Sequence, residues 1–422
     1  MGISAVQNPT AQQFANGEIH DWYTIIWGFS DHLVEKLINR LGLSQRDRVL
    51  DPFCGTGTTL VECLKNQVSA VGVDANPASV LAARVKTDWS VCPTQLFDAL
   101  DEVIRTYNRS LGQNHGFTND ATHRYLRESG MIDRGWISAV PLRKSLALKR
   151  AINIQNYIGK LDRALRLSLI AEVVKTASNV RFGPELYCGP RKVDAPVIEA
   201  FADRTTKMAL DLYNAPRTTA RADVLLGDAR EVSSLQHHAR QSAFDAVICS
   251  PPYPAEHDYT RNGRLELAFL EEVVDVQSLR KHKRRMMRSH TKNIYVDDSD
   301  RSYAPEFDAL RALLKEVADA AAEKRHGFAR LYEKVVAEYF GGMRRHLAAV
   351  RRVLKHNGAC AYVVGDQASY AGVSIPTAEL LATVAEFEGF SVEGIEAWRD
   401  RRSSGTGKVV TENILFLRNN RN

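Results

Sequence analysis

Two kinds of hydrophobic pattern alternate along this chain of 422 residues. Short apolar runs bounded by glycine, proline or aspartate are typical of buried strands, and a helical repeat of apolar positions predicts amphipathic helices. The strand pattern occurs at 48–53, 69–76, 222–229, 244–250, 359–366 and 412–419. The helical pattern fills most of 95–220 and 271–330, and it returns at 376–388 and at 331–358, where Gly358 is the expected helix end. The chain is therefore expected to be an α/β protein.

The segment 48–76 has the order strand, glycine turn, helix, strand. Such a unit requires a parallel sheet with a right-handed crossover. Because two mostly helical stretches separate the strand patterns, we expect one α/β domain with two insertions. The expected parts are 1–95, 96–220 (first insertion), 221–270, 271–330 (second insertion) and 331–422.

Composition narrows the class of protein. No apolar run approaches the ~20 residues that span a bilayer, and the N-terminal segment lacks the order of a signal peptide. The six cysteines are scattered without a Cys-x-x-Cys pair, which argues against a disulfide framework or a zinc site. We therefore expect a soluble cytoplasmic protein without a metal. The net charge of +6 suits nucleic-acid binding but does not by itself indicate it.

A glycine-rich turn follows the first strand pattern, in "LDPFCGTGTTLVE". Asp51 ends the strand, and Gly55 and Gly57 allow a ligand to approach the backbone closely. Asp74, at the tip of the next strand, can accept hydrogen bonds from the hydroxyls of a ribose. The third glycine of a dinucleotide site is replaced by Leu60, and no Gly-Lys-Ser/Thr sequence of an ATP loop follows. A cofactor with a ribose and no pyrophosphate remains, and S-adenosylmethionine is the natural candidate.

"DPFCGTGTT" together with "SPPY" at 250–253 resembles the motif pair of the DNA amino-methyltransferases, which modify exocyclic nitrogens of cytosine or adenine. The resemblance covers roughly 20–95, 220–265 and 350–420, and it leaves the insertions unmatched. It implies a class I, Rossmann-like methyltransferase sheet with helices on both faces.

The same resemblance assigns cofactor roles. Asp51 would receive the ammonium group of the methionine part, Asp74 would hold the ribose, and Asp228 would contact the adenine amino group. "WGFSDHLVEKLI" at 27–38 resembles a further cofactor motif of the family, although its Ser30 is equally suited to cap a helix. The full set of predicted cofactor residues is Phe29, Ser30, Asp51, Pro52, Phe53, Gly55, Gly57, Thr58, Asp74, Ala75, Asp228 and Ala229.

The loop Ser-Pro-Pro-Tyr suits an amino-group acceptor. An exocyclic amino nitrogen is a weak nucleophile because its lone pair is delocalised, and acceptors aimed at its hydrogens assist the attack. The Ser250 side chain and the Pro251 carbonyl would be those acceptors, Pro252 would stiffen the loop, and the Tyr253 ring would stack on the base. A base in a duplex has to be flipped out to reach such a loop.

The first loop residue bears on the choice of base. In the family, serine at this position is associated with N4 of cytosine, and aspartate or asparagine with N6 of adenine. We therefore expect a cytosine-N4 DNA methyltransferase, with an N6-adenine or an RNA amino-methyltransferase as the alternatives. A nicotinamide oxidoreductase and a non-catalytic DNA-binding protein leave the SPPY loop unexplained. The cytosine-C5 class is excluded because its Pro-Cys nucleophile motif is absent.

Double-stranded DNA is the expected partner, and a cognate restriction endonuclease would be a second one. The region 96–220 is the candidate for target recognition, assisted by the basic run 280–293. Lys and Arg side chains of these regions would hold phosphates. The candidates are Arg181, Arg191, Lys192, Lys281, Lys283, Arg284 and Arg285.

Overall fold

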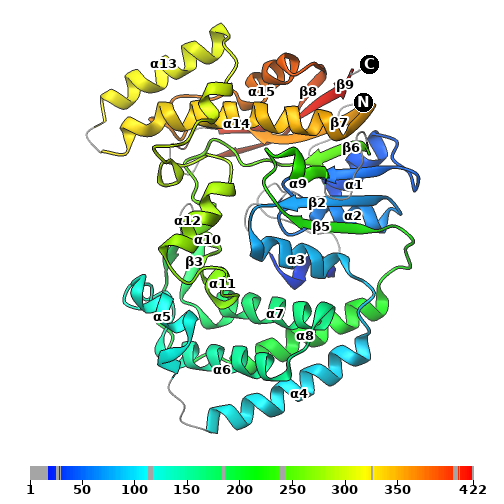
Figure 1. Ribbon diagram of the computed structural model, residues 1–422, viewed down its shortest axis with the longest axis vertical. Coiled ribbons are helices and arrows are strands. Elements are labelled where there is room, and N and C mark those ends of the chain that lie inside the picture. Colours follow the sequence, from blue (N-terminus) through cyan, green and yellow to red (C-terminus); the bar gives the residue numbers. More distant parts are fainter. Residues whose placement is uncertain are drawn as a thin grey trace.

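The computed structural model contains a mixed sheet of seven strands (Figure 1). It describes residues 18–24, 28, 30–112, 117–182, 186–236, 243–324, 327–402, 407 and 409–420. The strands are β1 (Arg48–Asp51), β2 (Ser69–Asp74), β5 (Ala222–Leu226), β6 (Phe244–Cys249), β7 (Leu354–Gly365), β8 (Phe390–Arg402) and β9 (Val409–Asn419). Their order is β5-β2-β1-β6-β7-β9-β8, and β9 is antiparallel to both of its neighbours. This topology confirms the predicted class I methyltransferase sheet.

Helices cover both faces of the sheet, which explains why its central strands are apolar on both sides. Val49 and Ala246 share one hydrophobic cluster with α1 (Asp31–Arg40), α2 (Thr58–Lys65) and α3 (Pro77–Thr87). Leu50 and Val247, one position further on, share the other cluster with α13, α14 and α15. The helices of this second face are α13 (Asp308–Ala322), α14 (Tyr332–Val353) and α15 (Thr377–Phe387).

The first insertion is mostly helical, as expected. Its elements are α4 (Pro93–Gly112), η2 (Phe117–Asn119), α5 (Ala121–Glu128), α6 (Ala139–Gln155), α7 (Gly159–Glu172), η3 (Val173–Ala177), β3 (Val180–Phe182), β4 (Leu186–Cys188) and α8 (Val197–Asn214). The hairpin of β3 and β4 and the π-helical turn η3 were not predicted. The helices form a layer beyond α3 (Figure 1). They share one apolar cluster with η1 (Ile19–Trp22), α3 and α11 (Arg264–Phe269), so this layer is fixed to the sheet domain.

The second insertion is less helical than the sequence suggests. Between α12 (Val276–Arg285) and α13, the chain forms only the short 3-10 turns η4 (Thr291–Asn293) and η5 (Asp300–Tyr303). The remaining short elements are α9 (Val232–Gln236), α10 (Tyr259–Asn262) and η6 (Ala329–Leu331).

Two expectations about the C-terminal part were wrong. Helix α14 ends at Val353 instead of Gly358, because Leu354 already pairs with Phe244 of β6. Strand β8 was missed because two register shifts, at Val392/Gly394 and Ala397/Arg399, interrupt its alternation of apolar and polar positions. Within the described residues, none of the helices combines the length and the apolar character of a bilayer-spanning segment.

Candidate functional site

Both motifs lie at one edge of the sheet, where the strand order reverses. From β1 the chain proceeds to β2 on one side, and from β6 it proceeds to β7 on the other. Crevices at the carboxyl ends of such strands are the usual ligand sites of open α/β sheets. The loops after β1 and β6 line a cavity of ≈ 1590 Å³ here.

The glycine turn requires its glycines for steric reasons. Gly57 precedes α2 with a φ of 90°, in the left-handed region, and a Cβ at this position would lie 3.1 Å from Cα and Cβ of Ala83. Gly55 has a φ of 50°, and its N–H donates a 2.9 Å hydrogen bond to Oδ2 of Asp74. The turn therefore presents bare backbone beside the cavity.

Two carboxyl groups flank this turn. Oδ1 of Asp51 accepts a 3.0 Å hydrogen bond from the N–H of Phe53, whereas Oδ2 is buried and has no hydrogen-bond partner among the described residues. Burial raises the pKa of Asp51 to about 7. Burial also raises the pKa of Asp74, to about 6, although the N–H groups of Gly55 and Asn76 donate to its oxygens. An unpaired buried carboxylate oxygen is costly, so a cationic or N–H donor would stabilise Asp51.

The segment after β5 forms a second wall. Asp228 lines the cavity, and the guanidinium of Arg230 donates to both oxygens of its carboxylate. The carbonyl of Ala229 accepts a 2.9 Å hydrogen bond from Nδ1 of His346. Burial lowers the pKa of His346 to about 4, and its neutral ring contacts the Phe53 ring in a tilted arrangement, with centroids 4.8 Å apart and the planes at 58°. The Asp228 carboxylate is thus held in place, and His346 joins two of the cavity walls.

The SPPY loop directly follows the buried strand β6. Oγ of Ser250 lies 3.2 Å from the hydroxyl of Tyr253, at hydrogen-bond distance. Pro251 is buried, and the other three residues of the loop are half-buried at the cavity wall. The two prolines fix the backbone between these hydroxyls and carry no N–H that could bind to neighbouring carbonyl groups.

Most of the predicted residues lie together. The predicted cofactor residues that line the cavity are Pro52, Phe53, Gly55, Asp74, Ala75, Asp228 and Ala229. The cavity is also lined by the four predicted catalytic residues, Ser250, Pro251, Pro252 and Tyr253. Ser30, Asp51, Gly57 and Thr58 do not line it. Ser30 precedes α1 at the N-cap position without a side-chain cap bond, and Phe29 lies outside the described residues.

The predicted phosphate-binding cations separate into different groups. Arg181 and Arg285 line the cavity. Lys283 is buried, and its ammonium donates to the Asp258 carboxylate at 3.4 Å, which contradicts the expected phosphate contact. Arg284 is paired with Asp297 at 2.7 Å outside the cavity. Also outside the cavity, Arg191 and Lys192 donate to backbone carbonyls, and Lys281 is exposed.

Sequence reasoning missed several cations of the cavity wall, among them Lys175 and Lys292. Lys175 lies in the π-helical turn η3, a type of turn that frequently marks functional sites. Lys292 lies in the basic run 280–293 but was not among its named candidates, and Lys175 belongs to no recognisable motif, so only the fold places both at the cavity.

Comparisons with known proteins show similarity to DNA methyltransferases. A sequence model described as DNA methylase, of the N6/N4 methyltransferases, matches residues 27–84. The type II methyltransferase M.BsoBI of Geobacillus stearothermophilus is 25% identical over 451 aligned positions, covering 96% of this chain and 84% of the relative. M.AvaI of Nostoc sp. is 26% identical over 428 positions, covering 94% of this chain and 84% of the relative. This chain is thus similar to the N6/N4 DNA methylases over residues 27–84 and to type II methyltransferases over most of its length.

These similarities agree with S-adenosylmethionine as the expected cofactor and disfavour the oxidoreductase alternative. The residues present fit this cofactor. The unpaired Oδ2 of Asp51 suits its ammonium group, and the turn at Gly55 and Gly57 has no side chains that would keep a ligand away from the backbone.

Proposed function

We propose that this methyltransferase transfers a methyl group to the exocyclic N4 of a flipped-out cytosine. The observation that carries the proposal is the position of Ser250. It opens the loop after β6, lines the cavity that the glycine turn also borders, and lies within 3.2 Å of the Tyr253 hydroxyl. Serine at this place is the family feature associated with cytosine.

The chain's own residues hold the reactants. Asp51 would pair with the ammonium group of S-adenosylmethionine, Asp74 with its ribose, and the Asp228 carboxylate with its adenine amino group. The cofactor supplies a methyl group that is electrophilic because it is bound to a sulfonium. Oγ of Ser250 and the carbonyl of Pro251 would accept the N4 hydrogens, which directs the nitrogen lone pair out of the base plane. The proton that the nitrogen loses after methylation can leave to solvent.

The first test asks which polymer accepts the methyl group. The protein is incubated with tritium-labelled S-adenosylmethionine and either unmethylated plasmid DNA or RNA, beside an Asp74→Ala variant. We expect label in DNA from the wild type and almost none from the variant. Label confined to RNA would overturn the proposal.

Cofactor affinity is expected to depend on pH through Asp51. Because burial raises its pKa to about 7, Asp51 is protonated at pH 5.5 and gains the charge that an ammonium group requires as the pH rises. We expect the Kd for S-adenosylmethionine to fall about tenfold between pH 5.5 and pH 7. Asp74, with a pKa of about 6, contributes in the same direction.

Isothermal titration calorimetry of the wild type and of Asp51→Asn measures this effect. The variant should bind more weakly at pH 7 and show a smaller change with pH. An identical pH dependence in both proteins would show that Asp51 does not pair with the cofactor.

A further inference from the structure

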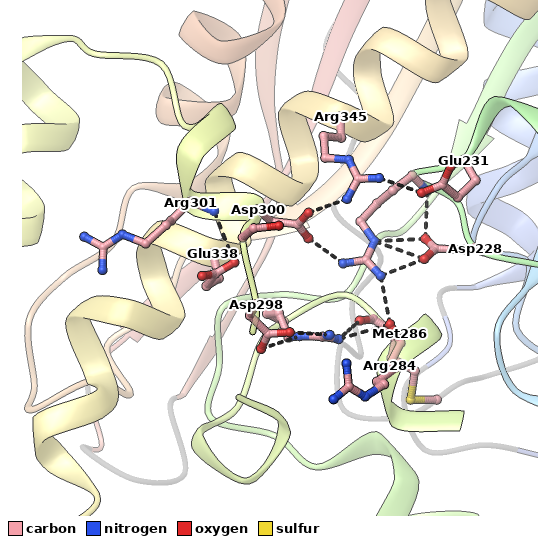
Figure 2. A network of polar contacts seen from close by, with 12 residues as sticks. Asp228, Glu231, Arg284, Met286, Asp298, Asp300, Arg301, Glu338 and Arg345 are labelled. Carbon is pink, nitrogen blue, oxygen red and sulfur yellow. Dashed lines mark hydrogen bonds and ion pairs between the residues drawn. The ribbon is translucent and has the colours of Figure 1, made fainter. Parts of the chain in front are cut away.

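One segment of the second insertion is attached to both motifs of the site. We call residues 283–300 the basic strap; it runs from the end of α12 to the start of η5. Its first anchor is Arg230, whose guanidinium binds the Asp228 carboxylate, the Asp300 carboxylate and the carbonyl of Arg284. Figure 2 shows these three partners, each of them labelled. Arg345 of α14 also binds Asp300, at 2.5 Å. The carboxylate predicted to contact the cofactor's adenine is therefore connected to both ends of the strap.

The second anchor is the loop that follows SPPY. Glu256, with a φ of 51°, accepts hydrogen bonds from the N–H of Thr291 at 3.1 Å and from its hydroxyl at 2.5 Å. The Tyr370 hydroxyl accepts from the N–H of Glu256 and donates to the carbonyl of Ser289. The strap is thus fixed beside the catalytic loop.

The strap is also braced internally. The Arg288 side chain is buried, pairs with both oxygens of Asp298, and donates to the carbonyls of Lys283 and Met286. The glycines of α14 let the strap approach: a Cβ on Gly341 would lie only 1.9 Å from the carbonyl oxygen of Asp300. The strap therefore has a defined shape without regular secondary structure.

The cations at the cavity wall differ in their partners. Arg204 pairs with Glu172, Lys207 with Asp211 and Arg399 with Glu412. For four further lining cations, Lys175, Arg181, Arg285 and Lys292, the described residues provide no ion pair within 4 Å, although the charge of Lys292 acts on the Glu256 carboxylate. Arg285 and Lys292 belong to the strap, and Lys175 and Arg181 belong to the first insertion.

We propose that Arg285 and Lys292 bind phosphates of the DNA strand that carries the target base, so that the basic strap is a backbone clamp of the active site. The proposal rests on the proposed function only in taking duplex DNA as the substrate. A flipped nucleotide brings its flanking phosphates to the cavity. A guanidinium and an ammonium that form no close ion pair within the described residues, on a braced segment beside the catalytic loop, match that charge. The anchors at Asp228 and Glu256 would hold the clamp in register with both motifs.

The test compares two double variants that each remove one arginine and one lysine. Arg285→Gln/Lys292→Gln removes the clamp. Arg46→Gln/Lys324→Gln removes two exposed cations that do not line the cavity and lie outside the regions expected to bind DNA. The affinity for an unmethylated plasmid fragment that the wild type methylates is measured over a range of salt concentrations, with cofactor affinity as the check of folding.

We expect the slope of log affinity against log salt to become shallower by about 2 in the clamp variant and to stay unchanged in the control. The KM for DNA should rise in the clamp variant, with kcat at saturating DNA retained. An unchanged slope in the clamp variant, or an equal change in both variants, would overturn the proposal. The salt dependence of DNA binding is measured without methyl transfer. A product other than N4-methylcytosine would therefore refute the base assignment without changing the interpretation of the binding measurement.

Discussion

Replacing Ser250 with alanine is expected to lower the rate of methyl transfer about 100- to 1,000-fold, since one acceptor of the amino hydrogens is lost where charge develops. The side chain is half-buried, and its only hydrogen bond within the described residues is to Tyr253, so the variant should fold and bind the cofactor normally. Single-turnover measurement with labelled S-adenosylmethionine and saturating DNA gives the rate.

Two further variants distinguish the effect of losing the Ser250 hydroxyl from the effect of removing a hydroxyl elsewhere in the protein. Tyr253→Phe keeps the ring that would stack on the base and removes only the group that contacts Ser250, so a smaller loss is expected. Ser90→Ala removes an exposed hydroxyl that binds Asp88 and does not line the cavity, and it should leave the rate of methyl transfer unchanged. A Ser250→Ala rate within a few-fold of the wild type would contradict the acceptor role.

Replacing Asp300 with alanine is expected to destabilise the protein by about 2–3 kcal/mol, because the buried guanidinium of Arg230 would lose one of its two carboxylate partners and keep only Asp228. Both side chains of the Arg230–Asp300 pair are 6% exposed, so water can replace the lost carboxylate only poorly. Arg345 would lose the same partner. Urea denaturation followed by circular dichroism measures the change, and the KM for DNA should rise because the strap loses its cofactor-side anchor.

Asp308→Ala is the matched control for this change. Asp308 pairs with Arg311 on the surface, where the two side chains are 96% and 64% exposed, and such pairs contribute little. The control should unfold at the urea concentration of the wild type. Equal midpoints for Asp300→Ala and Asp308→Ala would show that the Arg230 network does not stabilise this fold.

The parts of the site that the sequence predicted are those built from neighbouring residues. Asp51, Gly55 and Gly57 lie within one turn, and Asp74 ends the next strand, so a short pattern fixes the strand, turn, helix and second strand. The SPPY loop was recognisable for the same reason, because prolines after an apolar run end a strand in any context.

The parts that escaped prediction depend on partners far apart in the chain. Arg230 and Asp300 are 70 residues apart, and nothing local to either residue indicates the contact. Lys283 belongs to a basic run that is typical of a solvated helix, yet Asp258, 25 residues earlier, accepts from its ammonium in the interior. Charge density alone therefore could not separate the buried Lys283 from Arg285 and Lys292 at the cavity wall.

Mass spectrometry of nucleosides from DNA methylated by the wild-type protein tests the central claim most directly. Unmethylated DNA is incubated with the protein and isotopically labelled S-adenosylmethionine, digested to nucleosides and compared with DNA treated with Ser250→Ala. The proposed function predicts labelled N4-methylcytosine from the wild type and at most a trace from the variant. Labelled N6-methyladenine would keep the chemistry of the loop and contradict the assignment of cytosine as the target base.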